Sequence, residues 1–72
     1  MRLEFRLKEF REARGLTQGQ LAMRMRLDRS YIARIEHGQR VPALETAFRL
    51  ARFFKCSLED MIGLEPDASS ER

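Results

Sequence analysis

The stretch LDRSYIARIEHG over 27–38 carries polar side chains on one helical face that has no apolar reason to be buried. At a period of 3.6 residues, Ile32 and Ile35 share one side of this helix. The opposite side carries Ser30, Ala33, Arg34 and His37. An arginine guanidinium is a planar fork that can donate two parallel hydrogen bonds to a phosphate or to a guanine edge. This polar face is therefore available to a partner outside the domain.

Catalytic and metal-binding chemistry has little support in the sequence. The chain has one histidine, His37, and one cysteine, Cys56, and its carboxylates are not clustered. These residues supply neither a nucleophile–base pair nor a set of metal ligands. We therefore expect no enzyme activity, no metal and no cofactor.

The composition predicts one small domain with an uneven distribution of charge. The 72 residues are 43% hydrophobic and 35% charged, with a net charge of +3. Residues 1–55 contain thirteen basic and six acidic side chains, whereas residues 56–72 contain one basic and five acidic side chains. The apolar stretches are too short to span a bilayer, no signal peptide is recognisable, and one cysteine fits a reducing compartment. We expect a cytoplasmic protein with no membrane partner and no small-molecule ligand.

Two short helices are predicted before the polar face. The first carries apolar residues at every third position and ends at Gly15, which suits a left-handed helix end. Before the second, Thr17 and Gln20 match a capping box, in which each side chain accepts a hydrogen bond from the backbone of the other. The second helix therefore begins at Gln18.

Three further helices are predicted from residue 29 onward. The helix over 29–37 has Asp28 as its expected side-chain cap and Gly38 as its left-handed end. Ser57 and Asp60 mark the start of a last short helix. The fourth helix is the most apolar, and its expected core stripe is Leu44, Ala47, Phe48, Leu50, Ala51 and Phe54. The five helices together predict an all-α fold.

The two ends of the chain leave alternatives open. Apolar and charged residues alternate over 1–7, which is a strand signal, so the arm over 1–6 is either an extension of the first helix or an extended segment. An extended arm would pair with a second subunit or with the C-terminal helix. Residues 63–72, GLEPDASSER, are polar, acidic and rich in helix breakers, so we expect a disordered tail.

Over residues 7–62 the chain resembles the phage Cro and repressor family, also called the XRE family. The stretches that carry the resemblance are LKEFREARGLTQGQLA, LDRSYIARIEHGQRVPALETAFRLARFF and CSLEDMI. The resemblance implies a compact, five-helix, lambda-repressor-like domain whose second and third helices form a helix-turn-helix. It also implies a transcriptional regulator that binds double-stranded DNA as a homodimer on a palindromic operator.

On this resemblance, the helix over 29–37 is a recognition helix that enters the major groove. The residues expected to contact base edges are Arg29, Ser30, Ala33 and Arg34. The residues expected to contact phosphates are Gln18, Arg26, Tyr31, His37, Gln39 and Arg40. The alternative function is a protein-interaction module or antitoxin-like adaptor that keeps the fold without specific DNA binding. The arginines of the polar face argue against that alternative.

The resemblance also assigns structural positions. Arg11 and Glu36 match an arginine–glutamate pair of the family, which would give the inward-facing carboxylate of Glu36 a partner. Arg26 and Lys55 stand where the family has glycine, so both should adopt a left-handed backbone at a cost of about 1 kcal/mol each. Ala43 replaces the usual capping serine or threonine before the fourth helix.

The C-terminal part of the chain has more apolar side chains than one core face accommodates. Phe53 and Phe54 are consecutive and cannot share one side of a helix. We expect the outer apolar residues to be covered by a second copy across a two-fold axis. The expected dimer interface consists of Phe53, Met61, Ile62 and Leu64.

Overall fold

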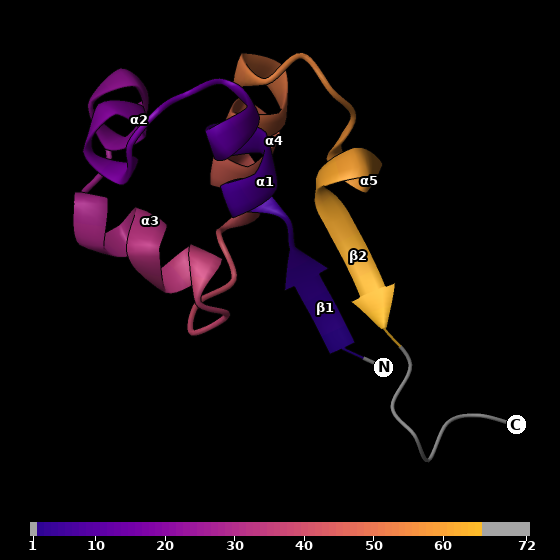
Figure 1. Cartoon of the computed structure of the whole chain (residues 1–72). Helices are drawn as coiled ribbons and strands as arrows, with labels where there is room; N and C mark the ends of the chain where they lie inside the picture. The colour runs from indigo at the N-terminus through magenta and orange to yellow at the C-terminus, as the bar shows by residue number, and fades with distance from the viewer. Residues whose placement is uncertain (1, 66–72) are drawn as a thin grey trace, which may run out of the picture.

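The computed structural model describes residues 2–65, with side chains over 4–63. The elements follow in the order β1 (Arg2–Phe5), α1 (Leu7–Ala13), α2 (Gln18–Met25), α3 (Arg29–Glu36), α4 (Leu44–Phe53), α5 (Leu58–Met61) and β2 (Ile62–Glu65). Figure 1 shows α2 and α3 at one end of the molecule, α1 and α4 in the middle, and the strands beside α5 at the other end. The predicted five-helix architecture is confirmed. Within residues 2–65, no helix has the length and apolar character needed to cross a membrane.

Capping side chains set the start of two helices where the sequence predicts them. Thr17 and Gln20 form a complete capping box at the start of α2, and Ser57 and Asp60 form the same arrangement at α5. The prediction for Asp28 is wrong, because its side chain makes no capping bond to α3. The N–H of the third helical residue donates to the Asp28 backbone oxygen, at 3.1 Å.

Left-handed residues end several helices. Gly15 and Gly38 have φ angles of +69° and +73°. Arg26 and Lys55 have φ angles of 59° and 58°, as expected for residues at positions where the family has glycine. Ala43 is the N-cap of α4 and supplies no side-chain hydrogen bond. Four helices therefore end at a left-handed residue. Glycine adopts this backbone freely, whereas Arg26 and Lys55 adopt it only with strain.

All five helices contribute to one core. The large side chains that are fully buried are Leu7, Leu21, Ile32, Ile35, Leu50 and Met61. Ala22, which is only 4% exposed, is small enough to let α2 and α3 cross closely. This packing fixes which side of α3 faces outward.

The predicted core stripe of α4 is wrong at two positions. Leu44 is 68% exposed and Phe48 is 52% exposed. The buried residues of α4 are instead Ala47, Leu50 and Ala51. Phe48 lies about 100° around the helix from Ala47, because one residue advances an α-helix by that angle. Ala47, Leu50 and Ala51 form the inner side of α4, and the side chains of Leu44 and Phe48 remain outside the core.

Strands β1 and β2 form a two-stranded antiparallel sheet that adds to the helical fold. The register runs from Arg2 opposite Glu65 to Phe5 opposite Ile62. The N-terminal segment is therefore extended, and a helical extension is wrong for residues 2–5. Its partner is the strand after α5, and neither the C-terminal helix nor a second subunit is needed to pair it. In this way the sheet joins the two ends of the described chain.

The predicted start of the disordered tail, at residue 63, is wrong. Residues 63–65 belong to β2, whereas 66–72 lie outside the described residues. Gly63 is buried beneath the side chain of Arg6, and a Cβ atom at Gly63 would lie 2.7 Å from Arg6 Nη2. The Arg6 N–H donates to the Met61 carbonyl oxygen at 2.7 Å, which extends the pairing. Composition alone could not show this strand, because its partner lies at the opposite end of the sequence.

Candidate nucleic-acid interface

The helix α3 is anchored on one side and open on the other. Ile32 and Ile35 are 0% and 2% exposed. The outer side carries three exposed residues and one half-buried residue: Arg29, Ser30, Arg34 and Ala33. The polar face found in the sequence therefore points out of the domain. A helix presented in this way fits a major groove about 12 Å wide.

The backbone closes the C-terminal end of α3. The Gly38 N–H donates to the Ile35 oxygen at 3.1 Å, and the Gln39 N–H donates to the Arg34 oxygen at 2.9 Å. With Gly38 left-handed, this is a Schellman motif. The chain therefore turns away from α3 directly after its polar face, and Arg40 follows in the exposed loop.

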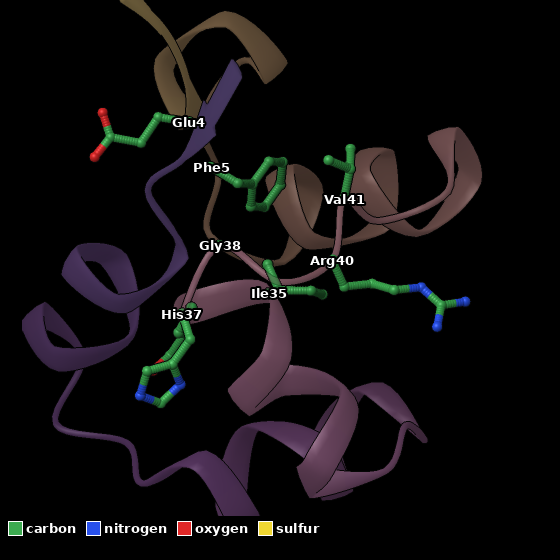
Figure 2. Close-up of a pocket in the computed structure, with 8 residues that line it drawn as sticks. Glu4, Phe5, Ile35, His37, Gly38, Arg40 and Val41 are labelled. Atoms are coloured by element: carbon green, nitrogen blue, oxygen red, sulfur yellow. The ribbon is translucent and has the colours of Figure 1, made fainter. Parts of the chain in front are cut away.

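His37 lies at this helix end and borders a cleft. Its ring is exposed, and Nδ1 lies 2.8 Å from the Ala33 carbonyl oxygen, so a proton on Nδ1 would donate to that oxygen. The cleft, of about 620 Å³, is lined by Glu4, Phe5, Ile35, Glu36, His37, Gly38, Arg40 and Val41. Figure 2 shows the charged ends of Glu4 and Arg40 extending away from Phe5 and Val41. The apolar side chains of Phe5, Ile35 and Val41 therefore share this cleft with polar side chains.

Arg11 and Glu36 form the ion pair expected from the resemblance. Arg11 Nε donates to Glu36 Oε2 at 2.6 Å, and Arg11 Nη2 donates to Glu36 Oε1 at 3.0 Å. Arg11 Nη1 also donates to the Leu16 oxygen at 2.7 Å. Burial alone would raise the pKa of Glu36, but hydrogen bonds from Arg11 and Gln18 outweigh burial and hold this pKa below its ordinary value. The pair is therefore charged in both members and fastens α1 to the end of α3.

Gln18 extends this pair to the surface of α3. Its Nε2 donates to Glu36 Oε1 at 3.0 Å, and its Oε1 accepts from Arg29 Nη1 at 3.2 Å. A continuous chain of hydrogen bonds thus runs from Arg11 through Glu36 and Gln18 to Arg29. The sequence assigned Gln18 only to a phosphate, and no local signal marks its contact with Arg29. One N–H of the Gln18 amide is still free to donate, because the amide nitrogen carries two.

A second cleft beside α3 is surrounded by arginines. It has a volume of about 560 Å³, and its lining residues are Arg26, Leu27, Asp28, Ser30, Tyr31, Arg34 and Arg40. The Arg40 guanidinium carbon lies 5.5 Å from the centre of the Tyr31 ring, a cation–π distance. Three arginines against one aspartate make this cleft a favourable place for an anion such as a phosphate.

The residues expected at a dimer interface do not form one exposed surface. Met61 is fully buried, so its assignment to the interface is wrong. Phe53 is half-buried, with its ring edge-on to Phe54 at 5.0 Å and beneath Arg14 at 5.5 Å. Ile62 is half-buried on β2, and the side chain of Leu64 lies outside the described part of the chain. The domain itself needs Met61, because α5 has only four residues and this one fills the core beneath it.

Comparisons with known proteins agree with this geometry. A family model described as helix-turn-helix matches residues 7–61. An uncharacterized HTH-type transcriptional regulator of Methanocaldococcus jannaschii is 39% identical over 62 residues, which cover 86% of this chain and 94% of the relative. Another, of Archaeoglobus fulgidus, is 38% identical over 56 residues, covering 78% and 80% of the two chains.

A solved structure is also similar. The restriction-modification controller protein C.AhdI from Aeromonas hydrophila shares 39% identity and superposes with a TM-score of 0.71 over 78% of this chain and 85% of its own. Sequence and structure comparisons therefore agree on a helix-turn-helix protein. The chain belongs to the XRE-type helix-turn-helix family of DNA-binding transcriptional regulators.

Proposed function

We propose that this regulator binds a palindromic operator in duplex DNA as a homodimer in the cytoplasm, with α3 of each subunit in the major groove. The observation that carries the proposal is the outer face of α3, where Arg29, Ser30 and Arg34 are exposed opposite two buried isoleucines. Exposed arginines on a rigidly anchored helix are suited to hydrogen bonding with base edges.

The base-reading roles follow from the chemistry of each side chain. Arg34 donates two hydrogen bonds to O6 and N7 of a guanine, and Ser30 donates to or accepts from either kind of base edge. Ala33 contacts a thymine methyl group. Arg29 is held by Gln18 at 3.2 Å, so its guanidinium is directed before DNA arrives. Less side-chain entropy is then lost when Arg29 binds a base or a phosphate.

The phosphate-binding roles belong to residues that flank α3. Arg26, Tyr31 and Arg40 line the arginine-rich cleft and are proposed to hold one backbone phosphate there. The remaining amide N–H of Gln18 donates to a second phosphate at the start of α2. His37 and Gln39, both exposed at the end of α3, contact the backbone beyond the groove.

The proposed homodimer follows from the amount of sequence that one helix can read. A single recognition helix contacts about four or five base pairs, which is too few to select a site in a genome. Two copies related by a two-fold axis double that number and match an operator of the same symmetry. The half-sites would then lie about 34 Å apart, which is one turn of DNA.

Arg34→Ala tests the proposal at the residue that carries it. On the preferred site the variant should lose about 1–3 kcal/mol of binding free energy, with relaxed choice at one base pair in each half-site. Arg24→Ala, an exposed arginine on α2, is the control and should leave base preference unchanged. Fluorescence anisotropy on specific and random duplexes measures both. Equal weakening on the two duplexes would contradict base reading by Arg34.

A further inference from the structure

An apolar stripe lies on the outer side of α4. Leu44 is 68% exposed and Phe48 is 52% exposed, and Val41, just before the helix, is 60% exposed. Leu44 and Phe48 are four residues apart and therefore occupy adjacent turns of one face. We call these three residues the α4 outer stripe. Their exposure is unexpected in a chain of 72 residues, because a small domain needs most of its large apolar side chains in the core.

The α4 outer stripe differs from an isolated exposed side chain. Met23 on α2 is 79% exposed but stands alone, and single exposed apolar residues are normal. Adjacent exposed apolar residues on one helical face, as Leu44 and Phe48 are, are typical of a surface that a partner covers.

The charged residues beside the α4 outer stripe could form ion pairs with the same residues of a second copy. Glu45 and Arg52 are seven residues apart, so they lie two turns apart on the same flank of the stripe. Both are exposed, and neither forms an ion pair with another residue in the described part of the chain. A second α4 lying antiparallel would place Glu45 opposite Arg52 of the partner subunit at two symmetric positions. A parallel two-fold dimer would put this flank of each subunit on opposite sides of the interface, so that neither pair could form.

We propose that the α4 outer stripe is a homodimer interface, occupied by a second copy of this chain whose α4 lies antiparallel across it. The two-fold axis passes between residues 48 and 49, midway between Glu45 and Arg52, so that both copies of Phe48 pack beside it. This inference deepens the proposed function and rests on it. It replaces the interface expected from the sequence, in which Met61 is buried and Phe53 is covered by Arg14.

Such an interface would also set the geometry of DNA reading. Residues 37–43 connect α3 directly to α4, so the α4 outer stripe begins shortly after the recognition helix ends. An axis through this stripe fixes the separation and orientation of the two α3 helices, which determine the half-site spacing. Loss of the dimer should therefore lower affinity for the full operator without changing the bases that each α3 prefers.

Sedimentation equilibrium of the full chain tests the apolar part of the interface. Phe48→Glu places two carboxylates beside the axis and should raise the dimer dissociation constant at least about 100-fold. Met23→Glu is the matched control, because it adds the same charge at a more exposed apolar residue of α2, and it should leave the constant unchanged. Far-UV circular dichroism checks that both variants keep the helical fold.

A charge exchange tests the antiparallel arrangement. Glu45→Arg and Arg52→Glu should each raise the dissociation constant about tenfold, because each places like charges opposite one another twice. The double variant restores both pairs with reversed polarity and should return the constant to within about threefold of the wild-type value. A wild-type chain that is monomeric at every concentration, a dimer unaffected by Phe48→Glu, or a double variant as weak as the single ones would overturn the proposal.

The same variants distinguish failure of this interface from failure of the proposed function. A monomeric Phe48→Glu chain that still binds one half-site, with a base preference abolished by Arg34→Ala, supports both proposals. If Phe48→Glu does not disrupt the dimer and Arg34→Ala still abolishes the base preference, only the proposed interface is rejected. If the dimer responds to the variants as expected but the chain has no base preference, the proposed interface stands and base reading by α3 is rejected.

Discussion

Arg11 begins a chain of hydrogen-bonded side chains that reaches the outer face of α3 at Arg29. The Arg11–Glu36 pair could be predicted from the sequence, because Glu36 faces inward beside two isoleucines and the family resemblance supplies an arginine. The contacts of Gln18 could not be predicted, because they depend on side-chain rotamers of residues distant in the chain. The ion pair that fastens α3 to α1 is therefore also connected, through Gln18, to Arg29 at the start of α3.

Replacement of Arg11 tests the energetic importance of the ion pair. Arg11→Ala should lower the free energy of unfolding by about 3–5 kcal/mol, because the Glu36 carboxylate would stay buried without its counter-ion. The double variant Arg11→Met, Glu36→Leu should recover most of this loss, since no charge is then buried. Urea unfolding measures both variants. A loss below about 0.5 kcal/mol in Arg11→Ala would mean that the pair contributes no more than surface charges do.

The lowered pKa of Glu36 predicts a pH dependence of stability. The folded chain holds this pKa below the ordinary value of a glutamate, so the stabilisation is present above about pH 4.3 and is lost as pH falls through the lower, folded value. The free energy of unfolding should therefore fall more steeply in acid for the wild type than for Glu36→Gln. Urea titrations between neutral pH and acid measure the two slopes, and equal slopes would contradict the assignment.

At the scale of elements, helix ends were easier to predict than helix faces. The capping boxes and the left-handed glycines have local signals in the sequence, and the family resemblance indicated the left-handed Arg26 and Lys55. The stripe of α4 was assigned wrongly, because periodicity identifies an apolar stripe but not which edge of it meets the core. The strand β1 stayed ambiguous for a related reason, since its partner β2 lies nearly sixty residues away in the chain.

Lys55 offers a test of the strained helix end after α4. Its φ of 58° is costly for any side chain with a Cβ atom, so Lys55→Gly should raise the free energy of unfolding by about 0.5–1 kcal/mol. Lys55→Ala removes the charge but keeps the Cβ atom, and its stability should stay close to that of the wild type. Thermal and urea unfolding compare the three proteins. If glycine and alanine have the same effect, backbone strain at this position is not the cause.

At the scale of the whole molecule, two surfaces have separate proposed tasks. We propose that the outer face of α3 reads DNA and that the α4 outer stripe holds a second copy at a fixed distance. The sequence predicted the family, the helical fold and the outward polar face of α3, because each depends on local spacing or on matching motifs. It did not predict the exposed α4 outer stripe, because only the packed structure shows that Val41, Leu44 and Phe48 lie outside the core.

Selection of bound sequences from a pool of random duplex DNA tests the central claim, sequence-specific reading by two copies of α3, most directly. The wild-type chain should enrich a two-fold symmetric site with a guanine in each half-site, at half-site centres about 34 Å apart. The same selection with Arg34→Ala should lose that guanine and keep the symmetry. No enriched sequence, or an enriched site without two-fold symmetry that Arg34→Ala leaves unchanged, would contradict the account.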